Sequence, residues 1–245
     1  YSLFQKFSCR DEAELIACRD NLSAQLFDST QLEERRSAMQ QELDVLSSEH
    51  ADIAEKLHLA RVEASTSFAS SIQDSIRNME LPYSIFEVDI QQTPLSATGK
   101  DAVAFRFSST GKNPVDVAKC ASGGEMSRIM LALKAMMAEY ANMPTMIFDE
   151  IDTGVSGSVA DKMGSVICSM GNHMQVFAIT HLPQVAAKGS AHYMVSKEID
   201  PDTAVAVSKI ERLSDEQRVL EVARMLSGSV LTEEAVANAR SLLKA

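Results

Sequence analysis

The chain lacks the features of a disulfide-rich, zinc-binding or membrane-spanning protein. Its cysteines show no Cys-x-x-Cys pair and no metal-ligand spacing, so reduced thiols are expected at Cys9, Cys18, Cys120 and Cys168. No apolar run approaches the roughly 18 residues of a membrane span, and the first ten residues are not a signal peptide. These absences predict a soluble, cytoplasmic protein without a membrane partner.

Basic residues are in the minority, with 23 Lys and Arg against 34 Asp and Glu and a formal net charge of −11. This balance argues against a chain that is a basic DNA-binding surface throughout, so any contact with DNA is expected to be local or to lie elsewhere. The 245 residues suffice for one large domain or two modest ones. Because the chain starts with Tyr1 in helical sequence, we interpret it as a piece of a longer protein.

A phosphate-cradling Gly-x-x-x-x-Gly-Lys-Ser/Thr loop is also missing. The nearest matches are residues 98–101 (TGKD) and 110–113 (TGKN). Neither has the upstream glycine, the Ser or Thr after lysine, or a strand-to-helix context, so both are expected to be turns. Any nucleotide site in this chain is therefore incomplete by itself.

The first part of the chain has the pattern of a helical arm, which we place at residues 1–80. Apolar residues recur at heptad spacing at Leu32, Met39, Leu46, Ile53 and Ala60, with Leu43, Leu57 and Ala64 in the companion register. Arg36 and His50 interrupt that register, which leaves one long helix packed on a globular body as the alternative to a coiled coil. The capping-box pattern at residues 30–33 (TQLE), together with a jump in apolar phase, predicts a helix break near residues 27–29.

The remaining residues, 81–245, have an α/β pattern. Alternating residues predict an antiparallel pair of strands at 83–90 and 102–107, with a loop rich in Pro, Gly and Thr between them. The chain then predicts a helix from about 120, strands at 145–149, 175–180, 192–196 and 204–210, and helices near 156–170, 215–226 and 232–244. Such alternation is typical of a largely parallel sheet with flanking helices.

Residues 120–134 (CASGGEMSRIMLALK) carry the most specific local signal. A Ser-Gly-Gly turn leads directly into an amphipathic helix, so backbone N–H groups and the positive end of the helix dipole face outward. Such a turn favours phosphate, although alone it is a weak indication.

Two acids end the apolar strand that follows, at residues 146–150 (MIFDE). Asp149 and Glu150 are expected at the carboxyl edge of the sheet, where open α/β folds bind ligands. We assign Asp149 to Mg²⁺, directly or through water, and Glu150 to orienting and deprotonating an attacking water. The alternative is a strand end with solvated acids.

A histidine follows the next apolar strand. His181 is expected at the same edge as the acids, where it can donate a hydrogen bond to a terminal phosphate; a structural histidine is the alternative. Between the two strands, residues 152–157 (DTGVSG) form either a flexible polar loop that approaches a partner subunit or a capping loop with Ser156 or Ser158 as N-cap.

Taken together, these residues resemble the ABC-type ATPase heads of the SMC-like family. The turn formed by Ser122, Gly123, Gly124 and Glu125 looks like the ABC signature, residues 146–150 like the Walker B strand, residues 151–157 like the D-loop, and His181 like the switch histidine. Ile151 stands where transporter ATPases usually carry proline. The likeness is strong from residue 82 to the end and covers the arm only by pattern.

The resemblance implies the carboxyl-terminal lobe of an ABC-type ATPase head, preceded by a coiled-coil arm. The amino-terminal half of the same head would supply the Walker A loop and the Q-loop. Two dimerised heads would sandwich ATP and Mg²⁺, with Glu150 and His181 catalytic and with the signature residues and Asp152 contacting nucleotide held by the other head. The implied role is recombinational repair of DNA double-strand breaks, in the bacterial cytoplasm at the nucleoid.

Two other classes stay open at this point. A structural or DNA-tethering module without its own turnover would have no need of Glu150 and His181. An ABC transporter ATPase predicts a permease partner and no helical arm before the signature, and the heptads and the Ile151-Asp152 sequence argue against it.

Overall fold

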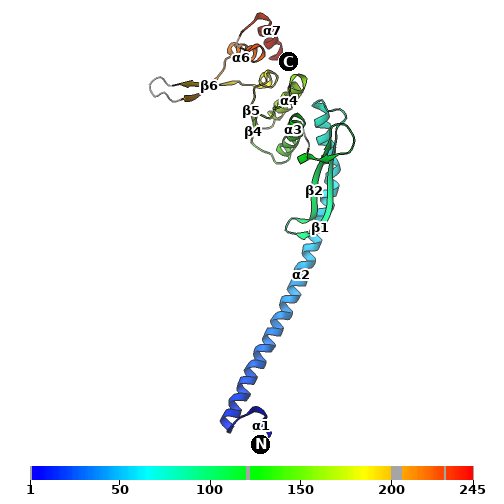
Figure 1. Cartoon of the computed structure of the whole chain (residues 1–245), viewed down its shortest axis with the longest axis vertical. Helices are drawn as coiled ribbons and strands as arrows, with labels where there is room; N and C mark the ends of the chain where they lie inside the picture. Colours follow the sequence, from blue (N-terminus) through cyan, green and yellow to red (C-terminus); the bar gives the residue numbers. More distant parts are fainter. Residues whose placement is uncertain (1, 120–121, 200–205, 229, 245) are drawn as a thin grey trace. The chain divides into compact units, whose positions relative to one another are not determined.

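The computed structural model describes residues 2–119, 122–199, 206–228 and 230–244 (Figure 1). Cys120 and Ala121 of the turn motif, and positions 204 and 205 of a predicted strand, lie outside the described residues. The chain divides into two compact units: residues 1–62 with 92–102, and residues 63–91 with 103–245.

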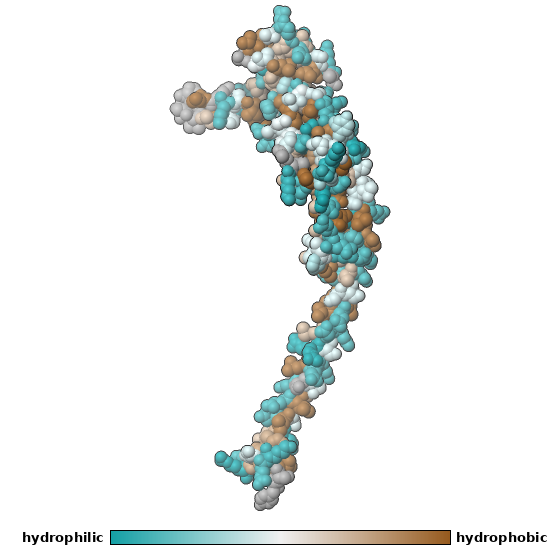
Figure 2. Space-filling model, turned by 45° about the vertical axis from the view of Figure 1, so that its right-hand side comes forward, coloured by the Kyte–Doolittle hydropathy of each residue, from teal (hydrophilic) through white to brown (hydrophobic). Residues whose placement is uncertain are grey.

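The arm is built on one helix, α2 (Glu12–Asn78), of 67 residues, preceded by the short helix α1 (Ser2–Phe7). The predicted helical arm is thus confirmed. Along its first part the heptad side chains are exposed, among them Leu32, Met39, Leu43, Leu46 and Ile53. Apolar residues there alternate with hydrophilic ones on the surface (Figure 2), as expected for one helix of a coiled coil.

The predicted helix break at residues 27–29 is wrong, because α2 runs through it without interruption. The Thr30 hydroxyl does not cap a new helix and instead donates to the Leu26 carbonyl oxygen at 2.9 Å, four residues back. Threonine side chains can make this bond inside a helix as well as at its start. The local pattern therefore did not distinguish the two positions.

The last turns of α2 belong to the second unit and pack in its core. Ile72, Ile76 and Met79 are fully buried, and Phe68 packs its ring against those of Phe86 and Phe105, at centroid distances of 6.4 and 5.6 Å. The end of the long helix therefore fits the interpretation of a helix packed on a globular body. The exposed heptads toward its start leave the coiled coil as a prediction.

A three-stranded sheet has the order β1–β2–β3, with β1 (Ile85–Ser96), β2 (Gly99–Ser108) and β3 (Val115–Asp116). The predicted strand pair is confirmed, since a two-residue connection permits only antiparallel pairing of β1 with β2. The predicted long loop is wrong, because both strands continue to a turn at residues 97 and 98. Pro94 fits within β1 because an edge strand tolerates a missing N–H donor.

The central elements of the second unit follow the predicted order: α3 (Gly123–Tyr140), β4 (Thr145–Asp149), α4 (Gly157–Met170) and β5 (Gln175–Ile179). β4 and β5 pair in parallel, from Thr145 opposite Gln175 to Asp149 opposite Ile179. The short helix α5 (Pro183–Lys188) was not predicted. Phe148, Ile129 and Met163 form part of the core beneath the sheet.

The chain ends in an antiparallel hairpin, β6 (Tyr193–Ile199) with β7 (Ala206–Arg212), followed by α6 (Asp215–Ser227) and α7 (Glu233–Leu242). Both helices were predicted, and they share a small core of their own, formed by Val222, Ala223, Ala235 and Ala239. Among the described residues, no helix has both the length and the apolar character that a membrane crossing requires.

Candidate functional site

The signature turn, residues 122–125, begins the 18-residue helix α3. Ser122 is its N-cap, with extended backbone angles, and its hydroxyl oxygen accepts the Glu125 N–H at 3.4 Å. Ser122 and Gly123 are exposed, whereas Gly124 is buried. The start of a helix of this length carries a partial positive charge, so the exposed part of the turn suits an anion.

Arg128 anchors the signature turn to the end of α2. Its Nε donates to the Gly124 carbonyl oxygen at 3.0 Å, and its Nη1 donates to the Met79 carbonyl oxygen at 3.2 Å. Burial lowers the pKa of this guanidinium, and the nearby carboxylates of Glu125 and Glu80 partly oppose that shift. Arg128 thus acts as a fixed donor beneath the turn.

On its other side, the turn rests on the loop of residues 150–156, which we call the linking loop. A Cβ on Gly124 would lie 2.6 Å from the Gly154 carbonyl oxygen, and Gly154 has a φ of +80° that favours glycine. The Ser127 hydroxyl donates to the Thr153 carbonyl oxygen at 3.1 Å. These contacts bring the signature turn to the segment that follows the acidic pair.

Asp149 is the last residue of β4, and Glu150 follows in a sharp turn with a φ of +47°. The Glu150 N–H donates to the Ile179 carbonyl oxygen at 3.1 Å. Thr153 donates its N–H and its hydroxyl to the Glu150 carbonyl oxygen, at 3.2 and 2.8 Å. A positive φ is unusual for glutamate, and these hydrogen bonds stabilise the Glu150 backbone in that conformation. The side chains of both acids are exposed.

Asp152, which is predicted to contact nucleotide held by another head, is buried within this chain. Its side chain is 1% exposed and points to the end of β5, where the Thr180 hydroxyl donates to Oδ2. The Thr180 oxygen in turn accepts the Leu182 N–H at 2.9 Å. Within the described part of the chain, Asp152 Oδ1 has no hydrogen-bond partner.

His181 lies between Thr180 and Leu182, directly after β5, and is exposed. Asp149 lies opposite Ile179 in the strand register, and Asp152 accepts a hydrogen bond from Thr180. The acidic pair and His181 therefore occupy the same edge of the parallel strand pair. The linking loop connects this edge to the signature turn. The predicted site residues are therefore gathered in one region.

Four supporting residues were missed by sequence reasoning: Ser127, Arg128, Thr153 and Thr180. The only available signal was a hydroxyl residue, Thr180, standing between a strand and the candidate histidine. Ser156 is the N-cap of α4, as one of the two alternatives had it, but its side chain makes no capping hydrogen bond.

The carboxylates offer a donor set suited to Mg²⁺. The described residues contain no group of three or more His, Cys, Asp or Glu side chains that could hold a metal by themselves. Mg²⁺ commonly uses only one or two carboxylates and takes its other ligands from phosphates and water. The exposed carboxylate of Asp149 fits this pattern.

One face of the parallel strand pair is open and apolar. Ile147, Phe177 and Ile179 are 63, 44 and 55% exposed, and the register places them on the same face as Asp149. We call these three residues the open sheet face. The opposite face carries Phe148, which is buried in the core.

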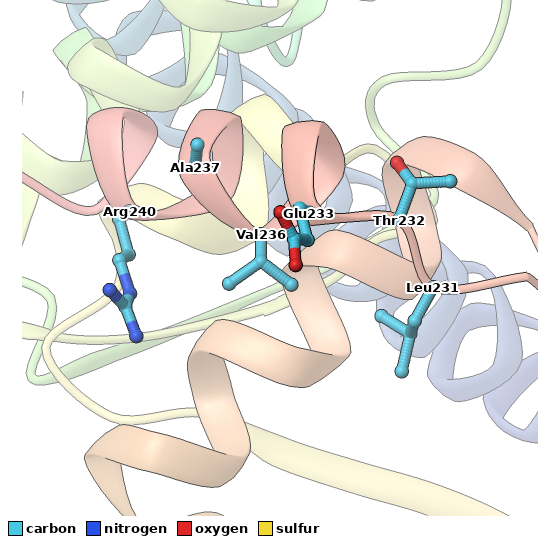
Figure 3. A pocket seen from close by; sticks show the side chains of 6 residues that line it. All are labelled: Leu231, Thr232, Glu233, Val236, Ala237 and Arg240. Atoms are coloured by element: carbon cyan, nitrogen blue, oxygen red, sulfur yellow. The ribbon is translucent and has the colours of Figure 1, made fainter.

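A shallow pocket of about 350 Å³ lies beside α7, lined by Leu231, Thr232, Glu233, Val236, Ala237 and Arg240 (Figure 3). It contains none of the predicted site residues. The candidate site is thus an exposed edge rather than a closed cavity.

The chain is similar in sequence to bacterial proteins named DNA repair protein RecN. It is 37% identical to that of Vibrio cholerae over 214 residues, which cover 86% of this chain and 38% of the relative. It is 32% identical to that of Xylella fastidiosa strain 9a5c over 248 residues, covering 100% of this chain and 44% of the relative. The chain thus spans less than half the length of these relatives. No model of a known protein family matches it.

The fold is similar to solved SMC heads. The Smc head domain with a coiled coil and joint from Pyrococcus yayanosii matches with a TM-score of 0.60 at 17% identity, covering 86% of this chain and 39% of that one. An Smc head bound to the C-winged helix domain of ScpA matches with a TM-score of 0.52 at 17% identity, covering 69% of this chain and 48% of that one. The fold class predicted from the sequence, an ABC-type head lobe with a helical arm, is confirmed.

Proposed function

Because this chain is a homologue of the RecN DNA repair proteins, we propose that it is the carboxyl-terminal lobe of an SMC-like ATPase head. The head would act in recombinational repair of DNA double-strand breaks. The observation that carries the proposal is the linking loop, which joins a phosphate-suited helix start to an edge bearing Asp149, Glu150 and His181. Hydrolysis of ATP would take place between two dimerised heads.

Each residue of the edge would have a separate task. Asp149 would hold Mg²⁺, which offsets negative charge on the phosphates. Glu150 would orient a water molecule and accept its proton as the oxygen attacks the terminal phosphate. His181 would donate a hydrogen bond to that phosphate, and the N–H groups of the signature turn would bind a phosphate held by the opposite head.

A second polypeptide segment is needed, since the chain has no phosphate loop of its own. We assign the open sheet face to the amino-terminal half of the same head, which would bring that loop beside Asp149. The apolar face lies next to Asp149, which would bind the metal. It is a suitable binding surface for such a segment, because packing there would bury Ile147, Phe177 and Ile179. Contacts with DNA would come from local surfaces or from that other half.

The test is reconstitution. The chain should release almost no phosphate from ATP, and it should gain Mg²⁺-dependent turnover when it is mixed with the amino-terminal half. With Glu150→Gln in the reconstituted head, we expect ATP-bound head dimers that persist because the general base is missing. Turnover by this chain alone, or no turnover in the wild-type mixture, would contradict the proposal, and a monomeric Glu150→Gln head in ATP would contradict the role of Glu150.

A further inference from the structure

We propose that Asp152 and Thr180 form a positioning pair that sets the place of Glu150 relative to His181. The inference rests on the proposed function for its chemical meaning, but its geometry belongs to this chain. This role does not require either residue to touch metal or the attacking water, and it is separate from the nucleotide contact predicted for Asp152. Their role is to join the two backbone segments that carry the reacting side chains.

Asp152 is buried although its side chain is a carboxylate. A carboxylate with one hydrogen-bonded oxygen and a second oxygen without a partner in the described residues costs free energy to bury. Solvent lies near Asp152, because Asp149 and Glu150 on the same edge are exposed. If the loop needed only a polar residue at this position, the Asp152 side chain could face solvent. It points inward to Thr180 instead.

The Thr180 hydroxyl makes two hydrogen bonds at once. It donates to Asp152 Oδ2 and accepts the Leu182 N–H, so the backbone on both sides of His181 is tied to one side chain. Leu182 is also the N-cap residue of α5, which fixes the direction in which the chain leaves. His181 therefore lies on a short segment whose backbone is held on both sides by hydrogen bonds and by the start of α5.

The other end of the pair reaches Glu150. Asp152 lies two residues beyond it, inside a loop in which Thr153 binds the Glu150 carbonyl oxygen. The positive φ of Glu150 depends on that loop keeping its shape. A link between Asp152 and Thr180 thus sets the distance between Glu150, the general base, and His181, which donates a hydrogen bond to the phosphate. A displacement of about 1 Å between such groups can lower the rate on the order of 100-fold.

The experiment uses the reconstituted head. Thr180→Val removes the hydroxyl and keeps the shape, so we expect kcat for ATP to fall about 10- to 100-fold with KM nearly unchanged. Thr180→Ser restores the hydroxyl and should recover most of the rate. Asp152→Ala should resemble Thr180→Val, whereas Asp152→Asn, which still accepts the hydroxyl, should lose far less. Thr145→Val, at the opposite end of β4, is the matched control.

A second readout separates this inference from the proposed function. The Thr153 amide makes no bond to Thr180, so faster hydrogen exchange at Thr153 in Thr180→Val, but not in Thr180→Ser, would support the link even if the wild-type head were inactive. Unchanged exchange at Thr153, an unchanged kcat in Thr180→Val, or an equal loss in the valine and serine variants would overturn it. If Thr180→Val does not fold, the Asp152 variants decide by the same measures.

Discussion

Gly124 packs against the carbonyl oxygen of Gly154 so closely that a Cβ at Gly124 would lie 2.6 Å from it. Among the described residues outside the turn and its own helix, no atom lies within 4 Å of the place where a Cβ on the neighbouring Gly123 would be. Two adjacent glycines in one turn thus meet different surroundings, although the sequence presents them alike. The buried glycine joins the signature turn to the linking loop, and the exposed one faces the solvent.

Gly124→Ala is therefore expected to destabilise the chain, because the backbone of the linking loop cannot move aside as a flexible side chain would. Overpacking of this kind typically costs about 1–3 kcal/mol in the free energy of unfolding. Urea denaturation followed by circular dichroism measures it.

Gly123→Ala is the matched control, and it should be neutral or stabilising by up to about 1 kcal/mol, since alanine restricts the unfolded chain. Equal losses in both variants would show that the turn is intolerant of any side chain and that the contact with Gly154 is not the cause.

In the first unit, the tip of the β1–β2 hairpin is fastened to α2 through Asp101. Its Oδ1 lies 2.7 Å from His58 Nδ1, and its Oδ2 accepts Arg61 Nη1 at 3.0 Å. Arg61 also donates to the Thr98 carbonyl oxygen at 3.1 Å. Burial would raise the pKa of Asp101, but the hydrogen bonds from Arg61 and His58 outweigh it, so the pKa lies below its usual 3.8.

Asp101→Asn should loosen this fastening and increase amide hydrogen exchange at residues 98–100. Since the pKa of Asp101 is lowered on folding, its contribution is present above 3.8 and is lost as the pH falls through the folded value. Glu55→Gln breaks only an ion pair with Lys100 in which Glu55 is half exposed, so it should change exchange much less. The same exchange in both variants would contradict a dominant role for Asp101.

The sequence predicted the elements that build the site because each has a strong local signal. The apolar run before Asp149 and Glu150 and the glycine turn before α3 are both explicit in the residue pattern. The continuity of α2 was not predictable from Thr30, whose hydroxyl can either cap a helix or bind inside one. The inward orientation of Asp152 was also out of reach, because it depends on Thr180, 28 residues later in the chain.

His192 provides a prediction for mildly acidic pH. Burial lowers its pKa, the Arg218 charge lowers it further, and Glu221 partly opposes both effects. The unfolded chain therefore binds the proton more readily, so the contribution of neutral His192 is present above the usual pKa of 6.5 and is lost as the pH falls through the lower, folded pKa.

The free energy of unfolding should thus fall on acidification below pH 6.5, and His192→Gln should flatten that part of the profile. His173→Gln, at an exposed position, should leave the profile unchanged. Denaturant unfolding at a series of pH values makes the comparison, and identical profiles for the wild type and His192→Gln would exclude His192 as the cause.

The open sheet face bears on the association of the two halves of the head rather than on the stability of this chain. Phe177 is 44% exposed and pairs with Ile147 across the parallel strands, so a large part of it remains in contact with water in the isolated chain. If the amino-terminal half covers this face, burying the part of Phe177 that is still exposed contributes about 1 kcal/mol to binding, since full burial of such a side chain is worth about 1.5–3 kcal/mol. Phe177→Gln should then weaken the association of the two halves by about 3- to 10-fold, measured under conditions in which this chain stays folded.

Val230→Gln alters another exposed apolar residue away from the sheet and serves as the control. Isothermal titration of each variant with the amino-terminal half measures the affinity. An unchanged affinity in Phe177→Gln would mean that this half binds elsewhere and that the open sheet face has a different occupant. A loss of affinity in Phe177→Gln alone would place the missing phosphate loop against the face that carries Asp149.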